Sequence, residues 1–78
     1  MTQLENDLFW EMERTIKLLG GKSDITRILA VIRSEMPSSE AVREALIQLK
    51  CWNDKVEKKV PETIENPIYR VLKEDIIC

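Results

Sequence analysis

The sequence has no histidine, only two cysteines and only two glycines among its 78 residues. Without histidine, the commonest general base and the usual zinc ligand are both missing. Cys51 and Cys78 are too far apart in sequence to close a structural zinc site alone. Residues 20–23 (GGKS) match only the end of a phosphate-binding loop, because the first glycine of that motif, five residues before Gly21, is absent. We therefore expect a protein that is not an enzyme and that uses no metal or cofactor.

Long apolar runs are also absent. No stretch approaches the roughly 20 apolar residues that a membrane-spanning helix needs. Residues 1–7 lack the basic-then-apolar pattern of a secretory signal. Two cysteines, one of them at the last position of the sequence, make no disulfide framework and favour a reduced chain. These absences predict a cytoplasmic protein that does not enter a membrane.

The length and the charge limit the architecture and the partners. A chain of 78 residues is expected to form one domain, covering residues 1–78. Its formal net charge is −2. Proteins that bind nucleic acid without sequence preference are usually basic, because neutralisation of phosphates drives their affinity. A mildly acidic total makes nucleic-acid binding less expected, although a local basic patch can be enough.

Apolar residues recur at helical spacing in three segments, predicting helices at about residues 4–19, 24–36 and 39–52. The two glycines end the first helix and Pro37 ends the second. Asp24 or the serine before it is expected to cap the second helix, and Ser38 or Ser39 the third. The predicted buried stripes are Leu4, Leu8, Met12, Thr15, Ile16 and Leu19, then Ile25, Ile28, Leu29, Ile32 and Met36, and then Val42, Ala45, Leu46 and Leu49.

The segment after the third helix has two interpretations. Asn53 can adopt the left-handed conformation that closes a helix, although nothing forbids continuation to Val60. In the first interpretation, residues 55–60 and 68–72 pair as a β-hairpin, since the second run is rich in strand formers. In the second interpretation, the residues from Pro67 onward form a further helix with the proline at its first position.

The order of these elements resembles a winged helix-turn-helix domain over about residues 23–72. Residues 38–49 are similar to the recognition helix of that family, and residues 55–58 and 68–71 resemble the two strands of its wing. The resemblance implies a mainly α fold with a small two-stranded antiparallel wing at about residues 55–72. The alternative is an all-α bundle of four helices.

The resemblance also implies a DNA-binding regulatory protein. The recognition helix would lie in the major groove, where Arg43 suits guanine and Gln48 suits adenine. The lysines of the wing would neutralise phosphates. The residues expected to contact DNA are Ser39, Arg43, Gln48, Lys55, Lys58, Lys59 and Arg70.

The same third helix also supports a different hypothesis. Glu40 and Glu44 would repel phosphates, and Ile47 offers only an apolar contact. Acids around an apolar side chain are more typical of a protein interface than of a DNA-reading surface. The alternative function is therefore a protein-binding adaptor or inhibitor that uses this acidic and apolar face.

Trp10 gives an independent indication of an interface. It lies roughly opposite the predicted apolar stripe of the first helix, with Arg14 and Lys17 nearby on the helix surface. A tryptophan among polar residues often marks a binding surface, which favours a homodimer through the first helix. The alternative is that the first helix is covered on both sides and that Trp10 packs against the C-terminal segment.

Overall fold

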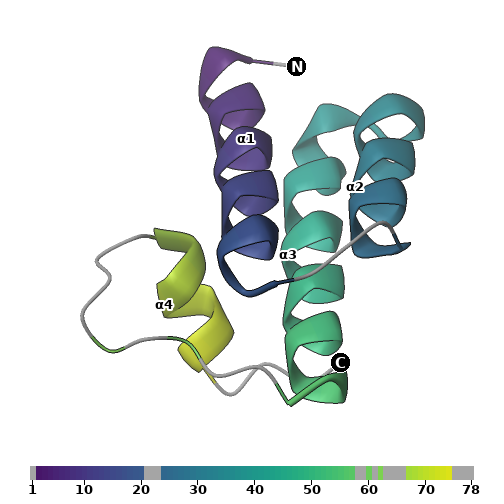
Figure 1. Ribbon diagram of the computed structural model, residues 1–78. Coiled ribbons are helices and arrows are strands. Elements are labelled where there is room, and N and C mark those ends of the chain that lie inside the picture. The colour runs from purple at the N-terminus through teal and green to yellow at the C-terminus, as the bar shows by residue number, and fades with distance from the viewer. Residues whose placement is uncertain (1, 21–23, 58–59, 61, 63–66, 75–78) are drawn as a thin grey trace.

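The computed structural model describes residues 2–20, 24–57, 60, 62 and 67–74. Over these residues the chain contains four helices and no β-strand (Figure 1). The helices are α1 (Gln3–Leu18), α2 (Asp24–Glu35), α3 (Ser38–Lys55) and α4 (Pro67–Lys73).

The long helix α3 lies at the centre of the arrangement. It runs between α1 and α2 and contacts all three other helices, whereas the short helix α4 packs against α1 and α3 on the side away from α2 (Figure 1). Because α1 and α2 also contact each other, the first three helices form a bundle, and α4 packs beside α1 and α3. This position of α3 explains why most of its faces are at least partly covered.

The core is built from aliphatic and aromatic side chains of all four helices. Ala41 and Ala45 on α3 are fully buried, and such small side chains let a neighbouring helix approach closely. Phe9 is also buried, whereas Leu4 of the expected stripe is 71% exposed, which corrects that part of the prediction. The buried apolar residues are Phe9, Met12, Ile16, Ile25, Leu29, Ile32, Ala41, Ala45, Leu49, Ile68, Tyr69 and Leu72.

A reciprocal cap that the sequence analysis overlooked fixes the start of α1. The side chain of Thr2 accepts a hydrogen bond from the backbone N–H of Glu5 at 3.2 Å, and the Glu5 carboxylate accepts one from the backbone N–H of Thr2 at 3.2 Å. These bonds satisfy backbone donors that the first turn of a helix leaves without partners. Hydrogen bonds from Thr2 also lower the pKa of Glu5 below its ordinary value.

The predicted wing is wrong, because α4 occupies the position of its second strand. A strand over residues 68–72 would put Ile68, Arg70 and Leu72 on one face, so that a charged side chain would enter the core with two apolar ones. A helix instead buries Ile68, Tyr69 and Leu72 and leaves Arg70 exposed. Pro67 is the first residue of this helix, as the alternative four-helix interpretation expected. The all-helical arrangement therefore replaces the winged-helix fold.

The ends of α3 also differ from the prediction. The helix begins after Pro37, which occupies the cap position without a side-chain hydrogen bond, so that Ser38 and Ser39 are helical residues rather than caps. At its other end, Asn53 is helical and buried, and α3 continues to Lys55. Glu57 takes the left-handed conformation instead, with φ of 54°. Asn53 therefore belongs to the packed part of the helix and does not terminate it.

Candidate protein-binding groove

Helix α2 presents apolar side chains on two different faces. Ile25, Leu29 and Ile32 point into the core and are almost completely buried. Ile28 and Val31 point outward, and they are 42% and 47% exposed. Helical periodicity predicted that Ile28 belongs to the buried stripe, and its exposure shows that this prediction was wrong. A surface helix normally has one apolar stripe with polar residues opposite, so the second apolar face of α2 requires a separate explanation.

A groove of about 420 Å³ lies beside this second face, between the first half of α2 and the second half of α3. On the α2 side, Ile28 and the almost completely buried Ile25 contribute its apolar wall. On the α3 side, Trp52 packs partly against the core and partly lines the groove. Val56, at the end of α3, is 43% exposed and extends the apolar surface. The complete lining is Asp24, Ile25, Ile28, Gln48, Cys51, Trp52, Lys55 and Val56.

Acidic residues lie at both ends of the outward face of α2. Asp24, Ile28, Val31 and Glu35 follow one another at spacings of four, three and four residues, so they share one side of the helix. Both acids are exposed. On the opposite wall, Gln48 donates a hydrogen bond to a Glu44 carboxylate oxygen at 3.0 Å. Asp24 therefore lines the groove, Glu44 contacts a lining residue, and Glu35 lies at the far end of the outward face of α2.

Lys55 is the basic residue among the groove-lining side chains. It is the last residue of α3, where a positive charge is favoured by the partial negative charge of the helix end. Asp24, on the same lining, begins α2, where a negative charge is favoured for the converse reason. The helix dipoles therefore account for the presence of Asp24 and Lys55 at this end of the groove. They do not account for Glu35 or Glu44, because neither carboxylate lies at the start of a helix.

Cys51 lines the same groove and is half-buried. The structure has this cysteine in a disulfide, in contrast to the reduced chain expected from the sequence. The other cysteine of the sequence, Cys78, lies outside the described residues.

The residues predicted to form an acidic and apolar face on the third helix are only partly exposed. Glu40 is exposed, whereas Glu44 and Ile47 are half-buried. Ile47 is not among the groove-lining residues, whose apolar members are Ile25 and Ile28 of α2 and Trp52 and Val56 at the end of α3, and Val31 is exposed further along α2 outside this lining. Val31 could have been recognised from the sequence as exposed, because it is apolar but falls outside the predicted buried stripe of a helix whose core face is already complete.

The residues predicted to contact DNA do not come together on one described face. Arg43 and Gln48 are five residues apart on α3, so their side chains diverge by about 140° around the helix axis. Gln48 is half-buried and already holds Glu44. Arg70 is exposed on α4, which contacts α1 and α3 but not α2. Of the remaining residues, Ser39 and Lys55 are exposed at opposite ends of α3, and Lys58 and Lys59 lie outside the described residues.

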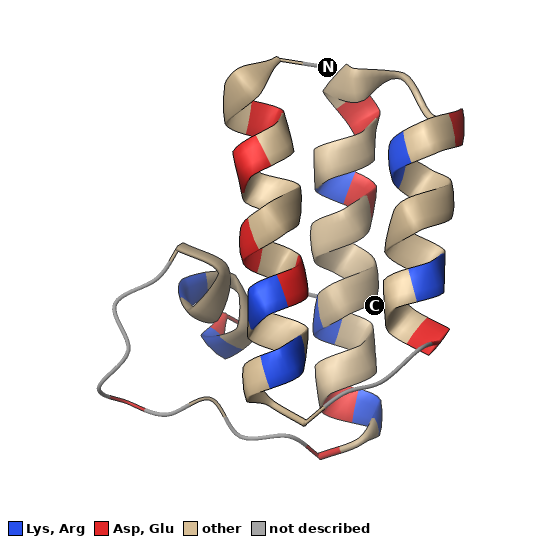
Figure 2. Cartoon of the chain, turned by 45° about the horizontal axis from the view of Figure 1, so that its top comes forward, with Lys and Arg blue, Asp and Glu red and all other residues tan. Residues whose placement is uncertain are grey.

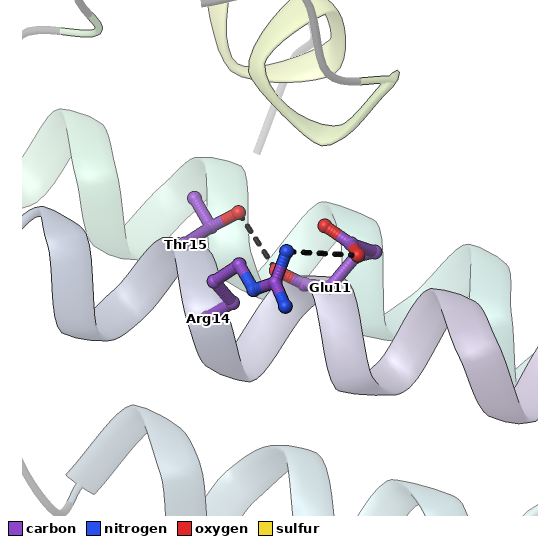
Figure 3. A network of polar contacts seen from close by, with 3 residues as sticks. All are labelled: Glu11, Arg14 and Thr15. Carbon is purple, nitrogen blue, oxygen red and sulfur yellow. Dashed lines mark hydrogen bonds and ion pairs between the residues drawn. The ribbon is translucent and has the colours of Figure 1, made fainter.

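Trp10 is exposed on the outer side of α1, as predicted, with 58% of its surface accessible. Arg14 and Lys17 are exposed on the same side. Figure 3 shows the local contacts of this part of the helix: the guanidinium of Arg14 lies 3.7 Å from a Glu11 carboxylate oxygen, and the Thr15 hydroxyl donates to the Glu11 main-chain oxygen at 2.8 Å. In the described part of the structure Trp10 is therefore not covered by the C-terminal segment.

A second, smaller hollow of about 190 Å³ lies where the start of α1 meets the end of α2. It is lined by Thr2, Gln3, Asn6 and Arg33, and Arg33 donates a hydrogen bond to the Asn6 side-chain oxygen. These polar groups satisfy one another, which is the usual function of such contacts between neighbouring helices. Among the described residues, no group of three histidine, cysteine or acidic side chains could hold a metal ion, and no helix is long and apolar enough to cross a membrane.

Comparison of the chain with protein-family models, curated proteins and solved structures found no match.

Proposed function

We propose that this domain is a non-enzymatic adaptor that binds another protein in the groove between α2 and α3. The observation that carries this proposal is the outward position of Ile28 and Val31, on a helix whose core face is already supplied by Ile25, Leu29 and Ile32. Exposed apolar side chains that adjoin a groove and have polar residues around them are typical of a protein-binding surface.

The shape of the groove favours an amphipathic helix as the bound segment. Its walls are two packed helices, and α2 is 12 residues long, or about 18 Å. A partner helix of three to four turns would match this length and would place apolar residues at spacings of three and four against Ile28, Val31 and Trp52. Recognition of this kind uses side-chain packing and requires no catalytic group.

The charges specify the polar side of that partner. Asp24, Glu35 and Glu44 lie around the apolar surface, and Lys55 is the basic residue on the groove lining. Complementary charges at the rim of an interface speed association and select among partners. The bound helix should therefore carry lysine or arginine beside its apolar residues. The same excess of carboxylates makes this surface a poor site for a nucleic acid, whose phosphates it would repel.

Selection from a library of helical peptides tests this proposal. The library is selected in parallel against the parent protein, against Ile28→Asp and against Ala30→Asp. Ala30 is exposed on the same helix but faces away from Ile28, so its substitution adds the same charge outside the groove. Circular dichroism of each variant establishes that the helices are intact.

The parent and Ala30→Asp should enrich amphipathic peptides with a net positive charge, and Ile28→Asp should bind them at least tenfold more weakly. Enrichment of acidic peptides, equal binding by both aspartate variants, or no enriched peptide at all would contradict the proposal. A fluorescence anisotropy measurement with duplex DNA at low salt completes the test, because tight DNA binding without peptide binding would favour the DNA-binding alternative.

A further inference from the structure

The outer face of α1 is a second unpartnered surface, remote from the groove. Trp10 is its largest side chain, and Leu4 and Leu18 are exposed near the two ends of the helix. The helix contacts its neighbours through Phe9, Met12 and Ile16, which point the other way. Three large exposed apolar residues on one helix of a small domain are more than its own packing explains.

The basic residues on this outer face lie toward one end of the helix. Asp7 lies in the first half of α1, whereas Arg14 and Lys17 lie in the second half, and Figure 2 shows basic colour only toward that end of α1, with acidic colour along the rest of the helix as far as the first basic band. An antiparallel copy of the same helix would bring its Asp7 toward the basic residues Arg14 and Lys17 of the first. The face is thus complementary to itself, as a two-fold interface requires.

The position of Trp10 agrees with such pairing. Helix α1 covers Gln3–Leu18, so its midpoint falls between Trp10 and Glu11. Asp7 and Arg14 are equally distant from that midpoint. A two-fold axis through it therefore places Asp7 of each copy opposite Arg14 of the other.

We propose that a second copy of this chain binds here, with the two α1 helices antiparallel, Trp10 at the centre and two Asp7–Arg14 ion pairs between the copies. Near the ends of the same face, Leu4 of one copy then lies close to Leu18 of the other. Apolar contacts at the centre with charged contacts around them are the usual arrangement of a protein interface.

The monomer leaves these charged groups able to change partners. Arg14 is 70% exposed at its side chain and contacts Glu11 at the long separation of 3.7 Å, and Asp7 accepts a hydrogen bond from Gln3 on the protein surface. No buried contact must break before Arg14 turns to a carboxylate of the second copy. The interface is one helix of about 24 Å on each side, smaller than a standard stable interface, so the dimer is reversible and its population depends on concentration.

Sedimentation equilibrium at low salt tests the pairing through a charge exchange. Asp7→Arg and Arg14→Glu each place like charges opposite one another twice, and each should weaken dimerisation at least tenfold. The double variant restores opposite charges in exchanged positions and should dimerise within about threefold of the parent. Arg27→Asp, an exposed charge reversal on α2, is the matched control and should leave dimerisation unchanged.

Trp10→Ala should weaken the dimer at least tenfold without loss of helix in circular dichroism. A parent that remains monomeric at millimolar concentration would overturn the proposal, as would a double variant no stronger than either single variant. If a single charge variant unfolds, the comparison of the folded double variant with the parent and with Trp10→Ala still decides the outcome. Failure of this test leaves the groove proposal unaffected, because the two surfaces share no residue.

Discussion

Lys50 of α3 donates a hydrogen bond from its ammonium group to the main-chain carbonyl of Leu72 in the last turn of α4. The carbonyls of a last helical turn have no partner within their own helix, and a positive charge is favoured at this end. Lys50 is only 8% exposed, and its ammonium also pairs with Asp54 at 3.1 Å. This single side chain therefore connects the end of the short helix to the central one.

Substitution of Lys50 by methionine should destabilise the fold. The change keeps the apolar stem but removes the donor to Leu72 and the partner of Asp54, and we expect a loss of about 1–3 kcal/mol in the free energy of unfolding. Asp54→Asn is the control and should cost less than about 1 kcal/mol, because Asp54 is half-exposed. Urea denaturation followed by circular dichroism measures both values. A methionine variant as stable as the parent would mean that the contact with Leu72 contributes nothing.

The helical conformation of residues 67–73 predicts a contrast between two neighbouring substitutions. Ile68→Ala should cost about 2–5 kcal/mol, because it removes part of a fully buried side chain. Arg70→Ala should change stability by less than about 0.5 kcal/mol, because Arg70 is exposed. In a strand these two side chains would share a face and both would be sensitive. Comparable losses for the two variants in chemical denaturation would therefore contradict the helix.

Tyr69 predicts a dependence of stability on alkaline pH. Its hydroxyl is buried without a well-formed hydrogen bond in the described residues, and burial raises its pKa above the ordinary 10.0, an effect that the neighbouring Thr15 hydroxyl partly offsets. The fold thus favours the neutral phenol. That contribution is fully present below the ordinary pKa of tyrosine and is lost as the pH rises through the higher pKa of the folded state.

Tyr69→Phe should therefore be at least as stable as the parent at neutral pH, within about 1 kcal/mol, because it removes a buried group with poor hydrogen bonding. Above a pH of about 10 the parent should lose more stability than the phenylalanine variant. Thermal denaturation across this pH range provides the comparison. Parallel pH profiles for the two proteins would contradict the raised pKa of Tyr69.

The first three helices could be predicted from the sequence because their boundaries are local. Gly20 takes a positive φ of 76° after α1, and Pro37 separates α2 from α3, as glycine and proline at those positions indicate. The wing could not be distinguished from a helix by propensity, since Ile68, Tyr69 and Val71 favour strands locally. The contacts of α4 with α1 and α3 decided its conformation, and such tertiary contacts override a weak local preference.

The candidate groove was harder to predict than the fold. Ile28 has helical spacing to the core residues of α2, so sequence periodicity assigns it to the buried stripe. Whether it is covered depends on the positions of α1 and α3, which no local pattern specifies. Trp10 was predictable because its angular position is opposite the whole apolar stripe of α1. The sequence therefore does not determine the exposure of residues at the edge of an apolar stripe.

The central claim is that the α2–α3 groove binds a basic amphipathic helix, and amide chemical-shift mapping tests it most directly. Nitrogen-15-labelled parent protein is titrated with a 15-residue helical peptide of leucine and lysine, and in parallel with a matched peptide of leucine and glutamate. The lysine peptide should shift the amides of Ile28, Val31, Gln48 and Lys55 and leave those of Arg14 and Lys17 unchanged, whereas the glutamate peptide should bind at least tenfold more weakly. Shifts concentrated on α1, equal responses to both peptides, or no response to the lysine peptide would contradict the account.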